Sequence, residues 1–207
     1  MASLAEETSD LTPRDLFGGA MTINVPSSWI DTEAFMDIIK RPVPDNQEIF
    51  MAPRSDANGA ADERPEAAPP VALFIDILEL ASDVEDPEQV PHFHALEVLK
   101  RDERAAEAEA LAVVPGAPLD LAESLTKDGG AGLMGVAATF DACDMEVAVV
   151  RIPKCETDLI FSLHGRIAAG EQAAGPPLTE LVPTLQVLEW GLFGGGGDEG
   201  QPQFLGA

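Results

Sequence analysis

The chain has 207 residues, of which 37 are acidic and 12 are basic, so its formal net charge is −25 at pH 7. This length fits a single domain with long loops. The charge argues against nucleic acids and anionic membranes as partners, because both attract clustered Lys and Arg. Solubility alone would explain the acidity, although a basic partner surface would also be attracted to it.

The N-terminus and the cysteines bear on the compartment. "MASLAEETSD" has acids where a signal or transit peptide would have Arg or Lys, and no apolar run approaches the ~20 residues needed to span a bilayer. We therefore expect a protein of the cytosol or nucleus, without membrane insertion. Cys143 and Cys155 are too few for a disulfide scaffold and lack zinc-site spacing, so we expect reduced thiols that are buried or half-buried.

The first predicted elements are a strand and a helix. In "LFGGAMTINV", residues 16–25, a Gly pair precedes alternating apolar residues, which is typical of a strand entered through a tight bend. The next stretch changes to a helical period. Asp31 is the expected N-cap, an apolar stripe follows it, and the helix should end before Pro42.

The central and C-terminal parts contain most of the expected sheet. "VALFIDILEL", residues 71–80, favours a central strand, with a buried helix as the alternative. A helix should begin at Asp86 and Pro87 and continue through the Ala- and Glu-rich stretch to residue 110. Four further strands are predicted, at 110–116, 130–141, 145–152 and 157–165. A last helix, kinked or delayed by Pro183, should bury Leu178, Leu181, Val182 and Leu185.

This order of elements predicts one α+β domain with a largely antiparallel sheet. Segments rich in Pro, Gly or Ala and poor in large apolar residues should not be part of the core. The predicted organisation is a disordered N-terminus at 1–13, a domain at 14–193 with disordered insertions at about 52–70 and 165–177, and a flexible Gly-rich tail at 194–207.

No pattern in the sequence indicates an enzyme. His92 and His94 are two apart in a helical context, whereas a metal site would need a spacing of three or four and a third ligand, so we expect one buried and one exposed ring. "KDGGAGLMG" lacks the final Lys and Ser/Thr of a phosphate-binding loop. His164 has no evident Ser or Cys partner. We expect no metal, no cofactor and no catalytic residues.

The strongest candidate site is the turn "VPDNQE", residues 43–48. Pro42 before it and Pro44 within it restrict the chain, Asp45 and Asn46 suit the turn itself, and Gln47 and Glu48 should point to opposite faces of the following strand. Two acids on a rigid turn can bind an Arg or Lys of a partner at small entropic cost. The alternative is a turn with solvated acids and no partner.

"LFGGAMTINVPSSWIDTEAFMDIIKRPVPDNQEIFM", residues 16–51, closely resembles the opening of the Mog family, the Ran guanine nucleotide release factors. "VALFIDILEL", "VRIPKCETDLIFSLHG" and "LVPTLQVLEWGLFG" are similar to later segments of that family. The resemblance implies an antiparallel sheet sandwiched by helices, a fold shared with PsbP-like photosystem proteins. It also implies binding to the GTPase Ran with release of its nucleotide.

Carried over by motif, the resemblance makes Asp45 and Glu48 the acids that bind Ran, with Asn46 and Gln47 in the same turn. Supporting positions are Phe17, Lys40, Arg41 and Phe50. Three departures concern this surface: "HFHALE" at 92–97 replaces an acidic stretch, Lys40 and Arg41 extend the segment before the turn, and the two phenylalanines fill aromatic positions because the chain has no tyrosine.

The resemblance further implies a non-covalent role in nuclear import, a location in nucleus and cytoplasm, and a monomer. A second Ran-binding protein in the same complex stays open. Two alternatives share the fold: an adaptor that assists delivery of membrane channels without nucleotide exchange, and a PsbP-like photosystem protein.

Overall fold

The computed structural model describes residues 10–31, 43–52, 71–165 and 175–193. Lys40, Arg41 and the helix predicted after Asp31 lie outside these residues. Most of the predicted disordered segments and the Gly-rich tail lie outside them as well.

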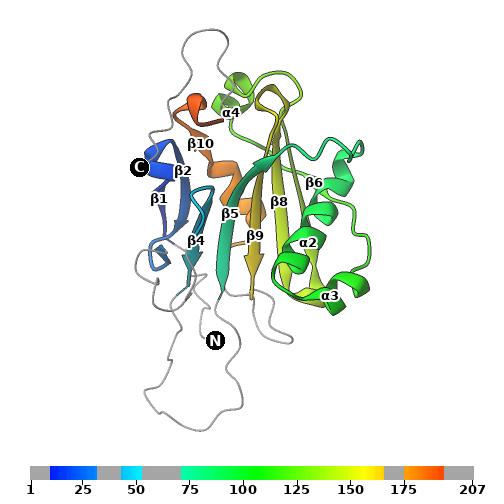
Figure 1. Ribbon diagram of the computed structural model, residues 1–207. Helices are drawn as coiled ribbons and strands as arrows, with labels where there is room; N and C mark the ends of the chain where they lie inside the picture. Colours follow the sequence, from blue (N-terminus) through cyan, green and yellow to red (C-terminus); the bar gives the residue numbers. More distant parts are fainter. Residues whose placement is uncertain (1–9, 32–42, 53–70, 166–174, 194–207) are drawn as a thin grey trace, which may run out of the picture.

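Seven strands form one antiparallel sheet in the order β3-β4-β5-β9-β8-β7-β6 (Figure 1). The stretch at 71–80 is a strand, and its Leu73 and Ile75 are fully buried. Strands β7, β8 and β9 follow one another through short turns, so local pairing builds this half of the sheet. The strands are β3 (Ile30–Asp31), β4 (Gln47–Met51), β5 (Ala72–Glu79), β6 (Ala117–Pro118), β7 (Met134–Phe140), β8 (Met145–Ile152) and β9 (Thr157–His164).

A smaller three-stranded sheet covers one face of the large sheet. It has the order β1-β2-β10, with β1 at Leu11–Leu16, β2 at Met21–Pro26 and β10 at Gln186–Val187. Met21, Ile23 and Val25 share one apolar cluster with inward residues of β5 and β9. This alternation was predicted, and burial of its apolar side stabilises the two-layer arrangement.

Strand β1 begins at Leu11, before the predicted domain start at residue 14. Its pattern is weak, because Pro13 and Arg14 interrupt the apolar residues. The strand forms through six paired positions with β2, from Leu11↔Pro26 to Leu16↔Met21. An edge strand tolerates proline because one side of its backbone needs no ladder partner.

Helices cover the other face of the large sheet (Figure 1). Asp86 caps a short 3-10 turn, Pro87–Gln89, by accepting a hydrogen bond from Glu88 N, as predicted. Helix α2 (Val90–Arg101) follows and packs on β7 and β8. The predicted continuous helix breaks at Glu103, whose φ is +59°, and resumes as α3 (Ala105–Ala110). A left-handed residue cannot continue a right-handed helix.

Two further predictions need correction. Residues 111–116 form no strand, because Pro115 lacks an N–H and Gly116 N donates to Glu88 O at 2.8 Å instead of pairing in a sheet. The last helix is only α5 (Leu178–Leu181), which passes into a 3-10 turn containing Pro183. All four of its predicted apolar residues are nevertheless buried, namely Leu178, Leu181, Val182 and Leu185.

The observed architecture confirms a single α+β domain with a largely antiparallel sheet. One outer layer is helical, as expected, while the other is mainly the small sheet together with α5; α4 (Glu123–Asp128) precedes β7. Cys143 and Cys155 are free and buried. None of the helices in the described segments combines the length and apolarity needed to cross a membrane.

Candidate partner-binding site

The turn before β4 is held in one conformation by backbone and side-chain bonds. Gln47 N donates to Pro44 O at 3.0 Å, which closes the turn around the exposed residues Asp45 and Asn46. Asn46 Nδ2 donates to Ile77 O and Ile77 N donates to Asn46 O, both at 2.9 Å. These two bonds attach the turn to the end of β5. The structure therefore presents Asp45 at an exposed and fixed position.

Gln47 lies on the inner side of this turn. It is buried, and its Nε2 donates to Asp76 Oδ1 at 2.6 Å. Arg101, at the end of α2, donates through Nη1 to the same carboxylate at 3.2 and 3.4 Å. Asp76 thus joins the turn to the helical layer. Gln47 positions the turn from within and offers no exposed surface to a partner.

Glu48 points to the opposite face of β4, as the alternation of a strand predicts. Its Oε1 accepts a hydrogen bond from Phe17 N at 2.8 Å. Phe17 begins a short 3-10 turn (Phe17–Gly19) in which all three residues have positive φ, at +50°, +69° and +91°. Only glycine adopts such values freely, which explains the Gly pair. Glu48 therefore connects two motifs that lie 31 positions apart in the sequence.

The two aromatic supporting positions lie beside this connection. Phe50 is buried in β4, and Phe17 is partly buried against the same apolar cluster. Both support the two turns by packing.

Replacing Glu48 by alanine should lower the free energy of unfolding by about 1–3 kcal/mol, because Phe17 N would lose a charged acceptor. Glu48→Gln keeps an acceptor oxygen and should lose less than half as much. Urea denaturation of the three proteins tests this expectation. Equal losses in both variants would show that the charge of Glu48, and not its bond to Phe17, is what stabilises the fold.

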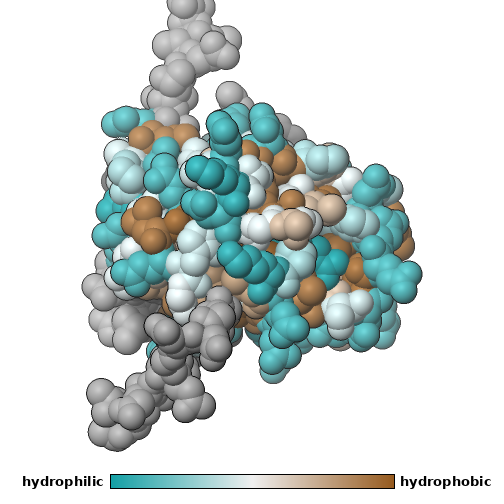
Figure 2. All heavy atoms as spheres, turned by 90° about the horizontal axis from the view of Figure 1, so that it is seen from above, coloured by the Kyte–Doolittle hydropathy of each residue, from teal (hydrophilic) through white to brown (hydrophobic). Residues whose placement is uncertain are grey.

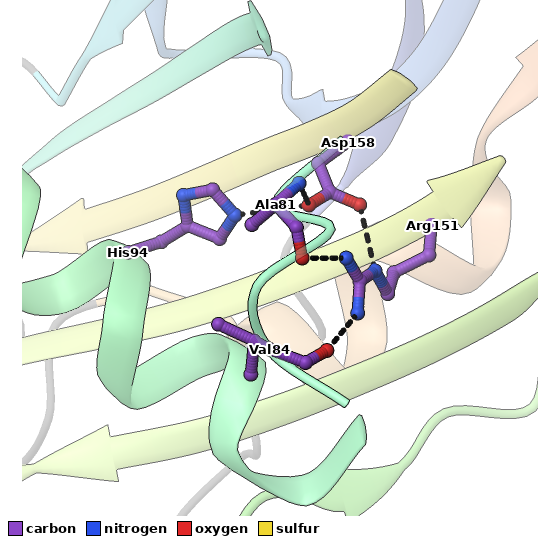
Figure 3. A network of polar contacts seen from close by, with 5 residues as sticks. All are labelled: Ala81, Val84, His94, Arg151 and Asp158. Carbon is purple, nitrogen blue, oxygen red and sulfur yellow. Dashed lines mark hydrogen bonds and ion pairs between the residues drawn. The ribbon is translucent and has the colours of Figure 1, made fainter. Parts of the chain in front are cut away.

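A second polar cluster fixes the segment that follows β5 (Figure 3). Asp158, which is fully buried in β9, accepts from Ala81 N at 3.0 Å, from His94 Nε2 at 3.1 Å and from Arg151 Nε at 3.0 Å. Arg151 also donates to the carbonyl oxygens of Ala81 and Val84. The sequence did not reveal this cluster, because its members lie far apart along the chain.

The two histidines of "HFH" have structural surroundings. His94 is buried against Asp158, whereas His92 is half-buried and not exposed as predicted, since its ring lies 6.2 Å from that of Phe140. Across the described ranges, no group of three or more potential ligands could hold a metal ion. The 92–97 segment thus belongs to a packed helix.

The fold is that of a single α+β domain that presents one fixed acidic turn at its surface. A sequence model described as "Ran-interacting Mog1 protein" matches residues 14–165 of the chain. Since this match covers well over half of the 207 residues, the chain belongs to the Mog1 family.

Solved structures agree with this assignment. A glutamate-to-alanine mutant of protein Mog1 aligns with a TM-score of 0.55 and 20% identity, over 89% of this chain and 99% of that chain. The Saccharomyces cerevisiae Ran-binding protein Mog1p aligns with a TM-score of 0.53 and 20% identity, over 90% and 100% of the two chains. At this identity the likeness shows the fold. No curated protein sequence matches significantly.

Proposed function

We propose that the protein binds the small GTPase Ran and promotes release of its guanine nucleotide, in support of protein transport between cytoplasm and nucleus. The observation that carries this proposal is the acidic turn: Asp45 is exposed on a turn that is bonded to two residues of β5, through the backbone of Ile77 and through the buried carboxylate of Asp76. Membership of a family described as Ran-interacting supports the choice of partner.

The proposed mechanism needs no covalent chemistry. If the protein binds nucleotide-free GTPase more tightly than the loaded form, linkage requires that it weaken nucleotide binding by the same factor. In this mechanism Asp45 pairs with a basic group near the nucleotide site and competes with phosphates or their Mg²⁺. Glu48 adds a second negative charge to the same turn, and its carboxylate also accepts the hydrogen bond from Phe17 N. The role is that of a release factor and not of an enzyme.

The acidity of the whole chain supports the same partner chemistry. A net charge of −25 should speed encounter with a basic surface. Salt at physiological concentration should screen this attraction beyond about 8–10 Å. A second Ran-binding protein could occupy the complex as well. The corresponding location is nucleus and cytoplasm, with the protein acting as a monomer.

Release of a fluorescent guanine nucleotide from purified Ran tests the proposal. Wild type should accelerate release, and Asp45→Asn should reduce both affinity and acceleration about tenfold, as for loss of one partner of an interfacial charge pair. Glu109→Gln is the matched control. It removes one exposed acid from α3, which lies near the start of β5. The acidic turn, in contrast, is bonded near the end of β5.

Three outcomes separate the alternatives. Acceleration that Asp45→Asn reduces and Glu109→Gln preserves would support a release factor acting through the turn. Binding of Ran without faster nucleotide release would indicate an adaptor and refute the release factor. Absence of binding by folded wild type would refute Ran as the partner.

A further inference from the structure

Two exposed leucines lie next to the Phe17 turn. Leu188 and Leu192 are 58% and 40% exposed, and they belong to the segment formed by β10 and the 3-10 turn Trp190–Phe193. This segment is fixed, because Leu188 N and Glu189 N both donate to Ala20 O, at 2.9 and 3.0 Å. Ala20 closes the Phe17 turn that Glu48 holds from its other side. Residues 17–20 are therefore bonded at one end to the segment that carries the two leucines and at the other end to Glu48 of the acidic turn.

A third exposed leucine lies on the other side of the acidic turn. Leu78 is 38% exposed and follows Ile77, whose backbone forms the two bonds with Asn46. Among the described residues, five large apolar side chains are more than a third exposed. Leu78 follows the β5 residue that is bonded to the acidic turn, and Leu188 and Leu192 lie beside the Phe17 turn that Glu48 binds. Figure 2, which looks down on the top of Figure 1, shows apolar patches between hydrophilic residues on this face of the molecule.

We infer that Leu78, Leu188 and Leu192 form the apolar part of the surface whose charged part is Asp45. The inference rests on the proposed function and specifies its partner: a region of the GTPase where a basic residue is flanked by apolar side chains. Charge and apolar contact depend on each other here. An exposed ion pair contributes little in water, whereas apolar contacts around it exclude water and strengthen it. The net charge of −25 favours a basic facing surface.

Binding of Ran to leucine variants tests this surface. The double variant Leu188→Ser/Leu192→Ser and the separate variant Leu78→Ser should each weaken binding about tenfold. Val113→Ser is the matched control, because Val113 is 60% exposed in the segment between α3 and β6. Affinities should be measured at low and high salt. The leucine variants should keep the wild-type salt dependence, whereas Asp45→Asn should reduce it, because only the aspartate contributes charge.

The outcomes distinguish this inference from the proposed function. If wild type binds Ran and both leucine variants bind as tightly as Val113→Ser, the apolar surface is refuted and the release function stands. If folded wild type does not bind Ran, both the proposed function and the apolar surface are refuted. If wild type sediments as a dimer that Leu188→Ser/Leu192→Ser dissociates, the patch joins two copies of this chain and the inference is overturned.

Discussion

Replacing Asp158 by alanine is expected to lower the free energy of unfolding by about 3–5 kcal/mol, the usual result of breaking a buried ion pair from one side. The side chain of Arg151 is only 11% exposed, so its charge would stay buried without the carboxylate. Ala81 N and His94 Nε2 would lose the same acceptor (Figure 3). The segment between β5 and α2 should loosen first, because Asp158 and Arg151 bond to it directly.

Urea denaturation of Asp158→Ala, Asp158→Asn and Asp83→Ala measures this effect. Asp158→Asn keeps one acceptor oxygen and should lose less than Asp158→Ala. Asp83 is exposed in the same segment, so Asp83→Ala should change stability by less than about 0.5 kcal/mol. A midpoint for Asp158→Ala equal to that of Asp83→Ala would show that the buried pair makes no net contribution.

Acidification to pH 4 is expected to cost about 3 kcal/mol of stability through His164 alone. Burial at the end of β9 lowers the pKa of His164 from 6.5 to about 4. The neighbouring charges have smaller effects: Asp102 and Asp144 raise its pKa, while Arg104 and Arg101 lower it. Below pH 6.5 the unfolded chain therefore binds a proton that the folded protein excludes. The stability that the fold has with a neutral His164 is fully present above pH 6.5, and it is lost progressively as the pH falls to about 4.

His164→Gln tests this dependence, since glutamine does not titrate. Wild type should lose stability between pH 7 and pH 4. The loss for the variant should be smaller than the loss for wild type by about 3 kcal/mol. Phe74→Leu is a useful control, because it changes the ring that packs edge-on against His164 at 5.4 Å but keeps the titrating group. Equal pH dependence in wild type and His164→Gln would show that the imidazole is protonated equally in both states.

Local signals in the sequence predicted much of the fold. Alternation identified β2 and β9, a short apolar run rich in valine identified β8, and the Asp86 cap and the Gly pair at 18–19 were each recognised from residues within one turn. The candidate turn was also correctly placed at the entrance to β4. These features depend on neighbouring residues, whose preferences are visible along the chain.

Features that depend on distant contacts were not predicted. Strand β1 has little alternation of its own and forms by pairing with β2. Gln47 was assigned to a partner surface, but it binds Asp76, which lies 29 positions away. The surroundings of Asp158 involve residues up to 77 positions away. No spacing rule identifies such pairs, because the sheet topology creates them.

The acidic turn takes its conformation from the strand beside it. Asn46 exchanges two hydrogen bonds with Ile77 of β5, whereas β3 pairs with the other end of β4, at Phe50 and Met51. The direction of Asp45 is therefore set by an interior strand of the large sheet and not by its edge strand. Substitutions that weaken the pairing of Ile30 and Asp31 should leave binding through Asp45 unchanged.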